Sequence, residues 1–89
     1  MKYKIIELTQ TCGACPSQWE GKLEDGRMIY IRYRYGGLEV SISYYPTDDV
    51  SDAVNGESIF QKYIGGAYDG VLDNEKMLFV LKDIIKCDI

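Results

Sequence analysis

One stretch of the sequence decides the fold: Ile29-Tyr30-Ile31-Arg32-Tyr33-Arg34-Tyr35-Gly36-Gly37-Leu38-Glu39-Val40-Ser41-Ile42-Ser43-Tyr44-Tyr45. Apolar and polar residues alternate through much of it, which is the period of a half-buried β-strand, and β-branched and aromatic residues are frequent. The two glycines in the middle are typical of a tight hairpin turn. The stretch therefore predicts two antiparallel strands with one core face and one polar face.

The register of this hairpin follows from a two-residue Gly36-Gly37 loop, which sets Tyr35 opposite Leu38. On the core face the predicted pairs are Tyr33 with Val40, Ile31 with Ile42 and Ile29 with Tyr44. On the polar face they are Arg34 with Glu39, Arg32 with Ser41 and Tyr30 with Ser43.

A third strand begins near Ser17 and ends before the turn signal Asp25-Gly26. A two-residue loop there would turn charged residues toward the core face, whereas the three-residue loop Glu24-Asp25-Gly26 turns Trp19 and Leu23 there. We therefore predict the longer loop, with Trp19 in the core rather than on a ligand.

The flanking segments predict shorter elements. Residues 3–9 form a first strand, although their apolar residues also fit a short helix, and residues 10–16 form a loop. Residues 47–56 fit a short helix capped by Thr47, and residues 57–64 fit a strand or a helix equally well.

The strongest helix signal covers residues 73–86, with Asp73 as the N-cap. Its apolar stripe is Met77, Val80, Leu81, Ile84 and Ile85, which should pack on the core face of the sheet. The predicted fold is a single α+β domain over residues 1–89. It is a three-stranded antiparallel meander, extended by the N-terminal strand if that strand forms, packed against a C-terminal helix, with one short helix besides.

Length and charge limit the functional classes. A chain of 89 residues buries only a small core, so we expect a homo-oligomer. A net charge of -4 argues against binding nucleic acid through a broad basic surface. The chain carries neither a membrane-length apolar run nor a signal peptide, so we expect a cytoplasmic protein.

Three cysteines raise the question of metal or redox chemistry. Cys12 and Cys15 form a C-x-x-C motif, and Cys87 is the only other cysteine. Without histidine, a zinc site would need a carboxylate or a second subunit, and a redox pair would need a helix that starts at Cys12. Structural thiols, a metal site and a redox pair all stay open, and we predict no cofactor and no metal ligand set.

The polar face of the meander is the predicted binding site. All three arginines fall within residues 27–34, in an otherwise acidic chain. Guanidinium groups hold phosphate or carboxylate, and tyrosine rings stack on bases, so the face suits an anionic, partly aromatic ligand. The predicted ligand-binding residues are Gln18, Glu20, Tyr30, Arg32, Arg34, Ser41 and Tyr45.

The simpler interpretation of this face is a solvated surface with cross-strand ion pairs, Arg34 with Glu39 and Arg32 with Glu20. Tyr33, Tyr35 and Tyr44 are predicted to belong to the core or to an oligomer interface. Because the chain lacks histidine, a nucleophile motif and a phosphate-binding loop, we predict no catalytic residues and no enzyme.

Several motifs resemble a family of small uncharacterised proteins from bacteria and their phages. They are Pro16-Ser17-Gln18-Trp19-Glu20-Gly21, Glu24-Asp25-Gly26-Arg27, and Ile29-Tyr30-Ile31-Arg32-Tyr33-Arg34-Tyr35-Gly36 with Leu38 and Val40. The resemblance covers about a quarter of the chain. It implies the cytoplasm of a bacterium or of a phage-infected host, where small acidic oligomers block or sequester other molecules.

The leading functional hypothesis is a non-enzymatic, phage-type counter-defence protein that sequesters a small nucleotide-like anion. The alternative is an inhibitor or adaptor that binds a host protein through its acidic or tyrosine-rich surface.

Overall fold

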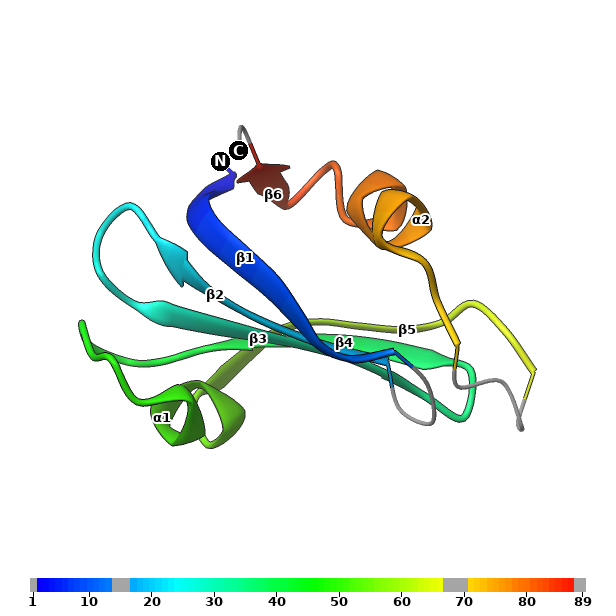
Figure 1. Ribbon diagram of the computed structural model, residues 1–89, viewed down its shortest axis with the longest axis horizontal. Helices are drawn as coiled ribbons and strands as arrows, with labels where there is room; N and C mark the ends of the chain where they lie inside the picture. The colour runs from blue at the N-terminus through cyan, green and yellow to red at the C-terminus, as the bar shows by residue number, and fades with distance from the viewer. Residues whose placement is uncertain (1, 14–16, 67–70, 88–89) are drawn as a thin grey trace.

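A single curled β-sheet forms the body of the protein. The structure is a computed structural model, and it describes residues 2–13, 17–66 and 71–87. The sheet has six strands in the order β5-β4-β3-β2-β1-β6, and it bends into a half-barrel (Figure 1). The strands are β1 Tyr3–Gly13, β2 Ser17–Leu23, β3 Met28–Arg34, β4 Gly37–Ile42, β5 Glu57–Tyr63 and β6 Ile85–Cys87.

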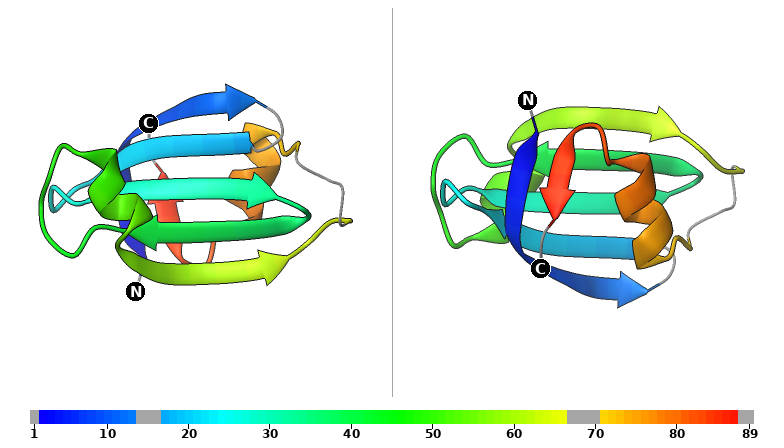
Figure 2. Two further views of the ribbon diagram at one scale, coloured as in Figure 1. Left: turned by 90° about the horizontal axis from the view of Figure 1, so that it is seen from below. Right: turned by 90° about the horizontal axis from the view of Figure 1, so that it is seen from above.

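Two short helices lie on opposite faces of this sheet. Helix α1, Val50–Val54, packs on the outer face of β3 and β4, whereas α2, Asn74–Val80, lies with β6 over the concave face (Figures 1 and 2). Neither of these described helices is long or apolar enough to span a lipid bilayer. The predicted α+β fold, a three-stranded meander packed against a long helix, is therefore wrong, because the protein is mostly β.

The concave face holds the core. Alternate residues of β2, β3 and β4 point into it and are fully buried, as strand geometry requires. Helix α2 and the strands β1 and β6 close it from above. The buried apolar residues are Ile5, Trp19, Leu23, Ile29, Ile31, Tyr33, Leu38, Val40, Ile42, Leu72, Met77, Leu81 and Ile85.

The first hairpin confirms the predicted three-residue loop. The backbone N–H of Leu23 donates to the carbonyl of Arg27 across residues 24–26, and Gly26 adopts a φ of 91°. This left-handed position favours glycine, which has no Cβ. In this register Trp19 lies opposite Ile31 and is buried, as predicted.

The second hairpin has a different register from the one predicted. Its turn is Tyr35-Gly36, with φ of 53° and 76°, and Arg34 pairs with Gly37. The carbonyl of Gly36 accepts hydrogen bonds from the N–H groups of Ile64 and Gly65, which hold this turn in place. The predicted pairs within the strands move by two residues, so each strand residue keeps its face but gains a new neighbour. Tyr35 and Tyr44 were predicted on the core face, but they lie outside β3 and β4 and are exposed.

The C-terminal helix is shorter than predicted. Asp73 caps it as expected, accepting a hydrogen bond from the N–H of Lys76 at 2.7 Å, but the helix ends at Val80. After a turn, the chain enters β6, which pairs in parallel with β1. Met77, Leu81 and Ile85 are all buried, so the helix-like apolar spacing continues past the end of the helix.

The other predicted segments are partly corrected. The first strand extends from Tyr3 to Gly13, well into the predicted loop, with register shifts on both sides of its middle part. Residues 14–16 lie outside the described part of the chain. Asp49 caps α1 in place of Thr47, and the ambiguous segment 57–64 contains strand β5.

Candidate anion-binding site

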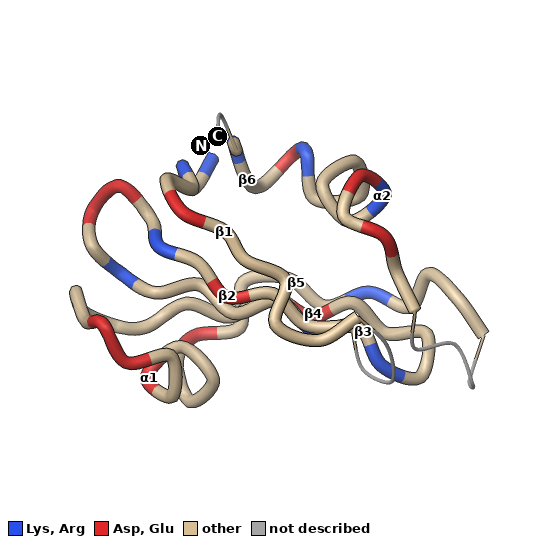
Figure 3. Tube along the Cα trace, in the orientation of Figure 1, with Lys and Arg blue, Asp and Glu red and all other residues tan. Residues whose placement is uncertain are grey.

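The outer face of the sheet consists of rows of side chains that run across the strands. Along each strand, the residues of this face alternate with the buried core residues. Across the strands, residues that pair in register form the rows. Helix α1 covers one end of this face, where Ser41 and Ser43 are buried. The other end contains the basic residues of β3 and is not covered by α1 (Figures 2 and 3).

One row of the uncovered end contains Gln18, Arg32, Glu39 and Gln61, each opposite the next. Arg32 Nη2 lies 4.0 Å from Glu39 Oε2, and about a third of each side chain is exposed. The predicted pairing of Glu39 with Arg34 is thus wrong, a consequence of the two-residue register shift. No ion pair joins Arg32 to Glu20 within the described ranges.

The last row contains Arg34, Gly37 and Tyr63. Because Gly37 has no side chain, a recess of about 140 Å³ opens over it. A Cβ placed on Gly37 would lie 3.2 Å from Cε1 of Tyr63, so the tyrosine ring reaches across the glycine. The recess is lined by Arg32, Arg34, Tyr35, Gly37, Glu39, Gln61 and Tyr63.

Tyr35 forms an unusual wall of this recess. Its φ of 53° lies in the left-handed region, which bulky residues rarely adopt. The turn places its ring 4.8 Å from the Cζ atom of Arg34, within cation–π range. Tyr35 and Tyr63 are 61% and 72% exposed, so both rings offer aromatic faces to a ligand.

The seven predicted binding residues do not form one site. Arg32 and Arg34 line the recess, and Gln18 lies beside Arg32 in the same row. Glu20 lies opposite Tyr30, which lies opposite the buried Ser41, closer to α1. Burial is the main reason why the pKa of Tyr30 is raised.

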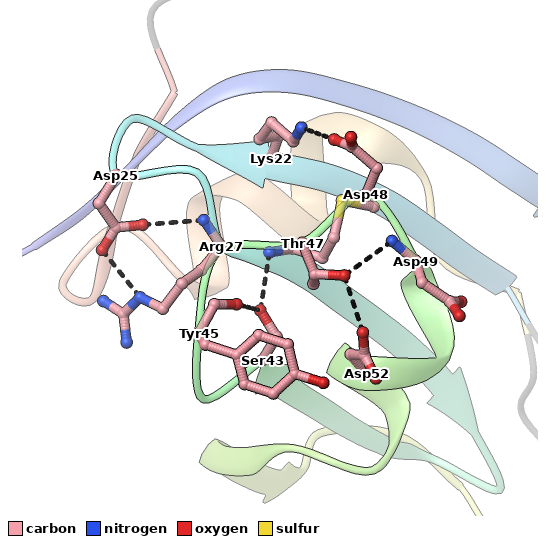
Figure 4. A network of polar contacts seen from close by, with 10 residues as sticks. Lys22, Asp25, Arg27, Ser43, Tyr45, Thr47, Asp48, Asp49 and Asp52 are labelled. Carbon is pink, nitrogen blue, oxygen red and sulfur yellow. Dashed lines mark hydrogen bonds and ion pairs between the residues drawn. The ribbon is translucent and has the colours of Figure 1, made fainter.

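Tyr45 lies at the opposite end of the outer face, in the polar network around α1 (Figure 4). The charge of Asp52 and a hydrogen bond to it raise the pKa of Tyr45. In the same network, Thr47 Oγ1 donates to Asp52, Lys22 pairs with Asp48, and Ser43 Oγ donates to the carbonyl of Tyr45. Tyr45 therefore belongs to the acidic end and not to the recess.

The sequence analysis missed Tyr35, Gly37, Gln61 and Tyr63. The sequence places Tyr35 in the core or an interface and Gly37 in the turn. Gln61 and Tyr63 come from β5, a segment whose pattern fits two structures. A local signal existed only for Tyr35 and Gly37, because an aromatic residue follows Arg34 directly and precedes a glycine pair.

A larger depression of about 310 Å³ on the sheet has the wrong charge for an anion. Its charged lining residues are Glu7, Glu20 and Asp48, and no basic residue lines it. The smaller recess combines two arginines with one glutamate. Charge therefore favours the recess over Gly37, rather than this depression, as the anion site.

The structure separates the two described cysteines. Cys87 in β6 pairs with Ile5, whereas Cys12 lies seven positions further along β1, on the order of 20 Å away along the strand. They cannot bind one metal ion within a single chain. Among residues 2–13, 17–66 and 71–87 no group of three metal-ligating side chains occurs, and Cys15 lies outside these ranges.

Comparisons with protein-family models, curated proteins and solved structures find no match to this chain.

Proposed function

We propose that this protein is a non-enzymatic binding protein that captures a small anion with an aromatic ring, such as a nucleotide-like molecule, over Gly37. One observation carries the proposal: Arg32, Arg34, Tyr35 and Tyr63 converge on a single recess from two strands, β3 and β5, and the turn after β3. This recess combines two arginines with two exposed tyrosine rings, whereas the pocket beside the first hairpin combines Lys2, Lys4 and Arg27 with the less exposed Tyr3.

The chemistry of the recess fits two parts of such a ligand. Arg34 has no ion-pair partner among the described residues, so its guanidinium donors are available to a phosphate or carboxylate. Tyr35 and Tyr63 provide the faces on which a planar ring stacks. Gln61 and Glu39 provide an amide and a carboxylate that can bind the polar edge of that ring.

The size of the recess sets how much of the ligand one chain can enclose. Pockets for small molecules typically measure about 300 to 1,000 Å³, so about 140 Å³ holds an anionic group and part of a ring system. The rest of the ligand would lie on the surface. A single recess is therefore expected to bind more weakly than an enclosed pocket of full size.

The wider role remains part of the proposal. Sequestration of a signalling nucleotide by a phage-type counter-defence protein in the cytoplasm is supported by the motif resemblance and by the charge of the recess. A homo-oligomer is supported by the small core of an 89-residue chain.

Calorimetric titration with inorganic phosphate, adenosine monophosphate and a cyclic dinucleotide tests the proposal. We expect at least one to bind, and Arg34→Gln to weaken it about 10-fold to 100-fold, as loss of a charged hydrogen bond does. Arg32→Ala should also weaken binding. Gly37→Ala should block the recess without changing charge, because the new Cβ meets the ring of Tyr63.

Arg27→Gln is the matched control. Arg27 is bonded to Asp25 in the first hairpin turn and does not line the recess. The Arg27→Gln change removes the same charge as Arg34→Gln. Because this charge lies outside the recess and is screened at physiological salt, binding should not change by more than about twofold. The proposal is wrong if none of the three probes binds, or if the Arg34 and Arg27 variants behave alike.

A second candidate function rests on the opposite end of the molecule. Residues 44–56 contain three acidic residues and neither lysine nor arginine, and Tyr44, Tyr45 and Val54 are exposed there. Such a surface suits a basic protein partner. A host protein retained by the native chain and by Arg34→Gln, but lost on Tyr44→Ser, would favour this inhibitor or adaptor function.

A further inference from the structure

Strand β5 forms one edge of the sheet, and it carries part of the recess. It pairs with β4 on one side only, so its other side presents backbone donors and acceptors without a strand partner among the described residues. Such an edge is a template for pairing with another chain. Gln61 and Tyr63, which line the recess, lie on the outer face of this edge strand.

A bulge determines which β5 side chains share a face. The register with β4 shifts between Phe60 and Ser58, so Ile59 is the extra residue. Ile59 and Phe60 both pack against the core, and Glu57 and Lys62 lie opposite the core residues Ile42 and Leu38. Glu57, Ile59, Phe60 and Lys62 therefore share the concave face. Ser58 and Gln61 share the outer face.

This arrangement makes the strand complementary to itself. A two-fold axis perpendicular to the sheet pairs two copies antiparallel and keeps each face on its own side. It then sets Glu57 opposite Lys62 of the partner subunit and Ile59 opposite the partner's Phe60, each twice. On the outer face Ser58 meets the partner's Gln61. Without the bulge, Glu57 and Lys62 would lie on opposite faces and could not pair.

From this symmetry we infer that β5 joins two copies of the chain into one continuous sheet, in the register that pairs Glu57 with the partner's Lys62. Glu57 and Lys62 are both exposed, and neither forms an ion pair within the described chain. A charge that points inward at a sheet edge normally discourages pairing. In the register proposed here, Glu57 and the partner's Lys62 neutralise each other. In other registers both charges stay unpaired, which favours this one.

The pairing also changes the recess, and this step rests on the proposed function. The recess borders the edge strand through Gln61 and Tyr63, and the dimer places the partner's Ser58 beside Gln61. The second copy thus adds an outer wall to the recess. The volume of the recess in one chain, about 140 Å³, is smaller than that of an ordinary small-molecule pocket. The dimer would enclose more of the ligand than one chain.

Charge reversal tests the interface without any ligand. Light scattering during size-exclusion chromatography should give twice the 10.1 kDa mass of one chain for the native protein, falling on dilution because the paired segment is short. Glu57→Lys and Lys62→Glu should each give the mass of one chain. The double variant should restore the dimer, which a folding defect would not do.

Glu24→Lys is the control for the charge change. Glu24 lies in the first hairpin turn, 3.9 Å from Lys4, and away from β5, so its reversal should leave the mass unchanged. A native protein with the mass of one chain at all concentrations would overturn the inference. So would single β5 variants that stay dimeric.

Titration of the same variants separates the interface from the proposed function. The nucleotide that binds the native protein should bind about tenfold more weakly to Glu57→Lys and regain its affinity in the double variant. Equal affinity in all three would refute the extended wall and leave the proposed function standing. Absence of nucleotide binding with a charge-dependent dimer would refute the proposed function and leave the interface standing.

Discussion

Arg32 lies directly opposite Glu39 on the outer face of the sheet, with Nη2 4.0 Å from Oε2, and both side chains border the recess over Gly37. The carboxylate holds one of the two recess arginines and lowers the positive potential that an anion would meet. The pair is about one-third exposed, so its contribution to stability is limited to about 0.2 to 1 kcal/mol.

Removing the charge of Glu39 should separate stability from binding. Glu39→Gln should cost less than about 1 kcal/mol of unfolding free energy. It should strengthen the binding of inorganic phosphate about twofold to fivefold, since phosphate has no ring edge for the carboxylate to bind and one repulsive charge is lost. Urea denaturation and calorimetry measure the two effects. Weaker binding in this variant would show instead that Glu39 orients Arg32 for the ligand.

Replacing Tyr35 should change stability and binding in opposite directions. Asparagine tolerates the left-handed region better than tyrosine, so Tyr35→Asn should stabilise the fold by about 0.5 kcal/mol after loss of the contact with Arg34. Anion binding should weaken because one aromatic wall is gone. Tyr44→Asn is the control, since Tyr44 is as exposed but has no positive φ, and it should give no gain in stability.

The indole N–H of Trp19 is a buried side-chain donor that has no hydrogen-bond partner among the described residues. An unpaired buried donor costs about 1 to 3 kcal/mol, so its removal offsets part of the volume lost in Trp19→Phe. We expect that change to cost less than about 2 kcal/mol, against about 3 to 5 kcal/mol for Trp19→Ala. Chemical denaturation with equal losses in both variants would show that the N–H group is satisfied.

The cap of α1 should make stability depend on pH in the acid range. Hydrogen bonds from the hydroxyl and the N–H of Ser51 hold the pKa of Asp49 below its ordinary value of 3.8. A lowered folded-state pKa contributes stability that is present above pH 3.8 and is lost as pH falls through the folded value. Asp49→Asn caps equally well but does not titrate.

Denaturation curves between pH 7 and pH 2.5 test this expectation. The Asp49→Asn variant should match the native protein at pH 7 and lose less stability in acid. Part of the acid dependence should remain in this variant. Burial raises the pKa of Asp25, but its hydrogen bonds with Arg27 outweigh that effect and lower the pKa overall. Identical pH profiles for the variant and the native protein would contradict the role of Asp49.

Local patterns predicted the centre of the sheet and its faces. The alternation in β2, β3 and β4 sorts core from outer residues, and this sorting holds even though the second hairpin is two residues out of the predicted register. The three-residue loop with Gly26, the burial of Trp19 and the cap at Asp73 also follow from local chemistry. Each depends on neighbours within a few residues, which the sequence displays directly.

Contacts between distant segments decided the rest. The carbonyl of Gly36 is held by residues after β5, which moves the turn to Tyr35 and sets Arg32 rather than Arg34 against Glu39. Ile85 belongs to strand β6 rather than to the predicted helix because β1, far away in the chain, offers it a parallel partner. The recess itself requires β3, β4 and β5 in register. The sequence by itself therefore determined which residues of β2, β3 and β4 face the core, because that depends on local periodicity. Only the tertiary structure decided which outer residues meet, because strand order and register are set by hydrogen bonds and packing between segments far apart in the chain.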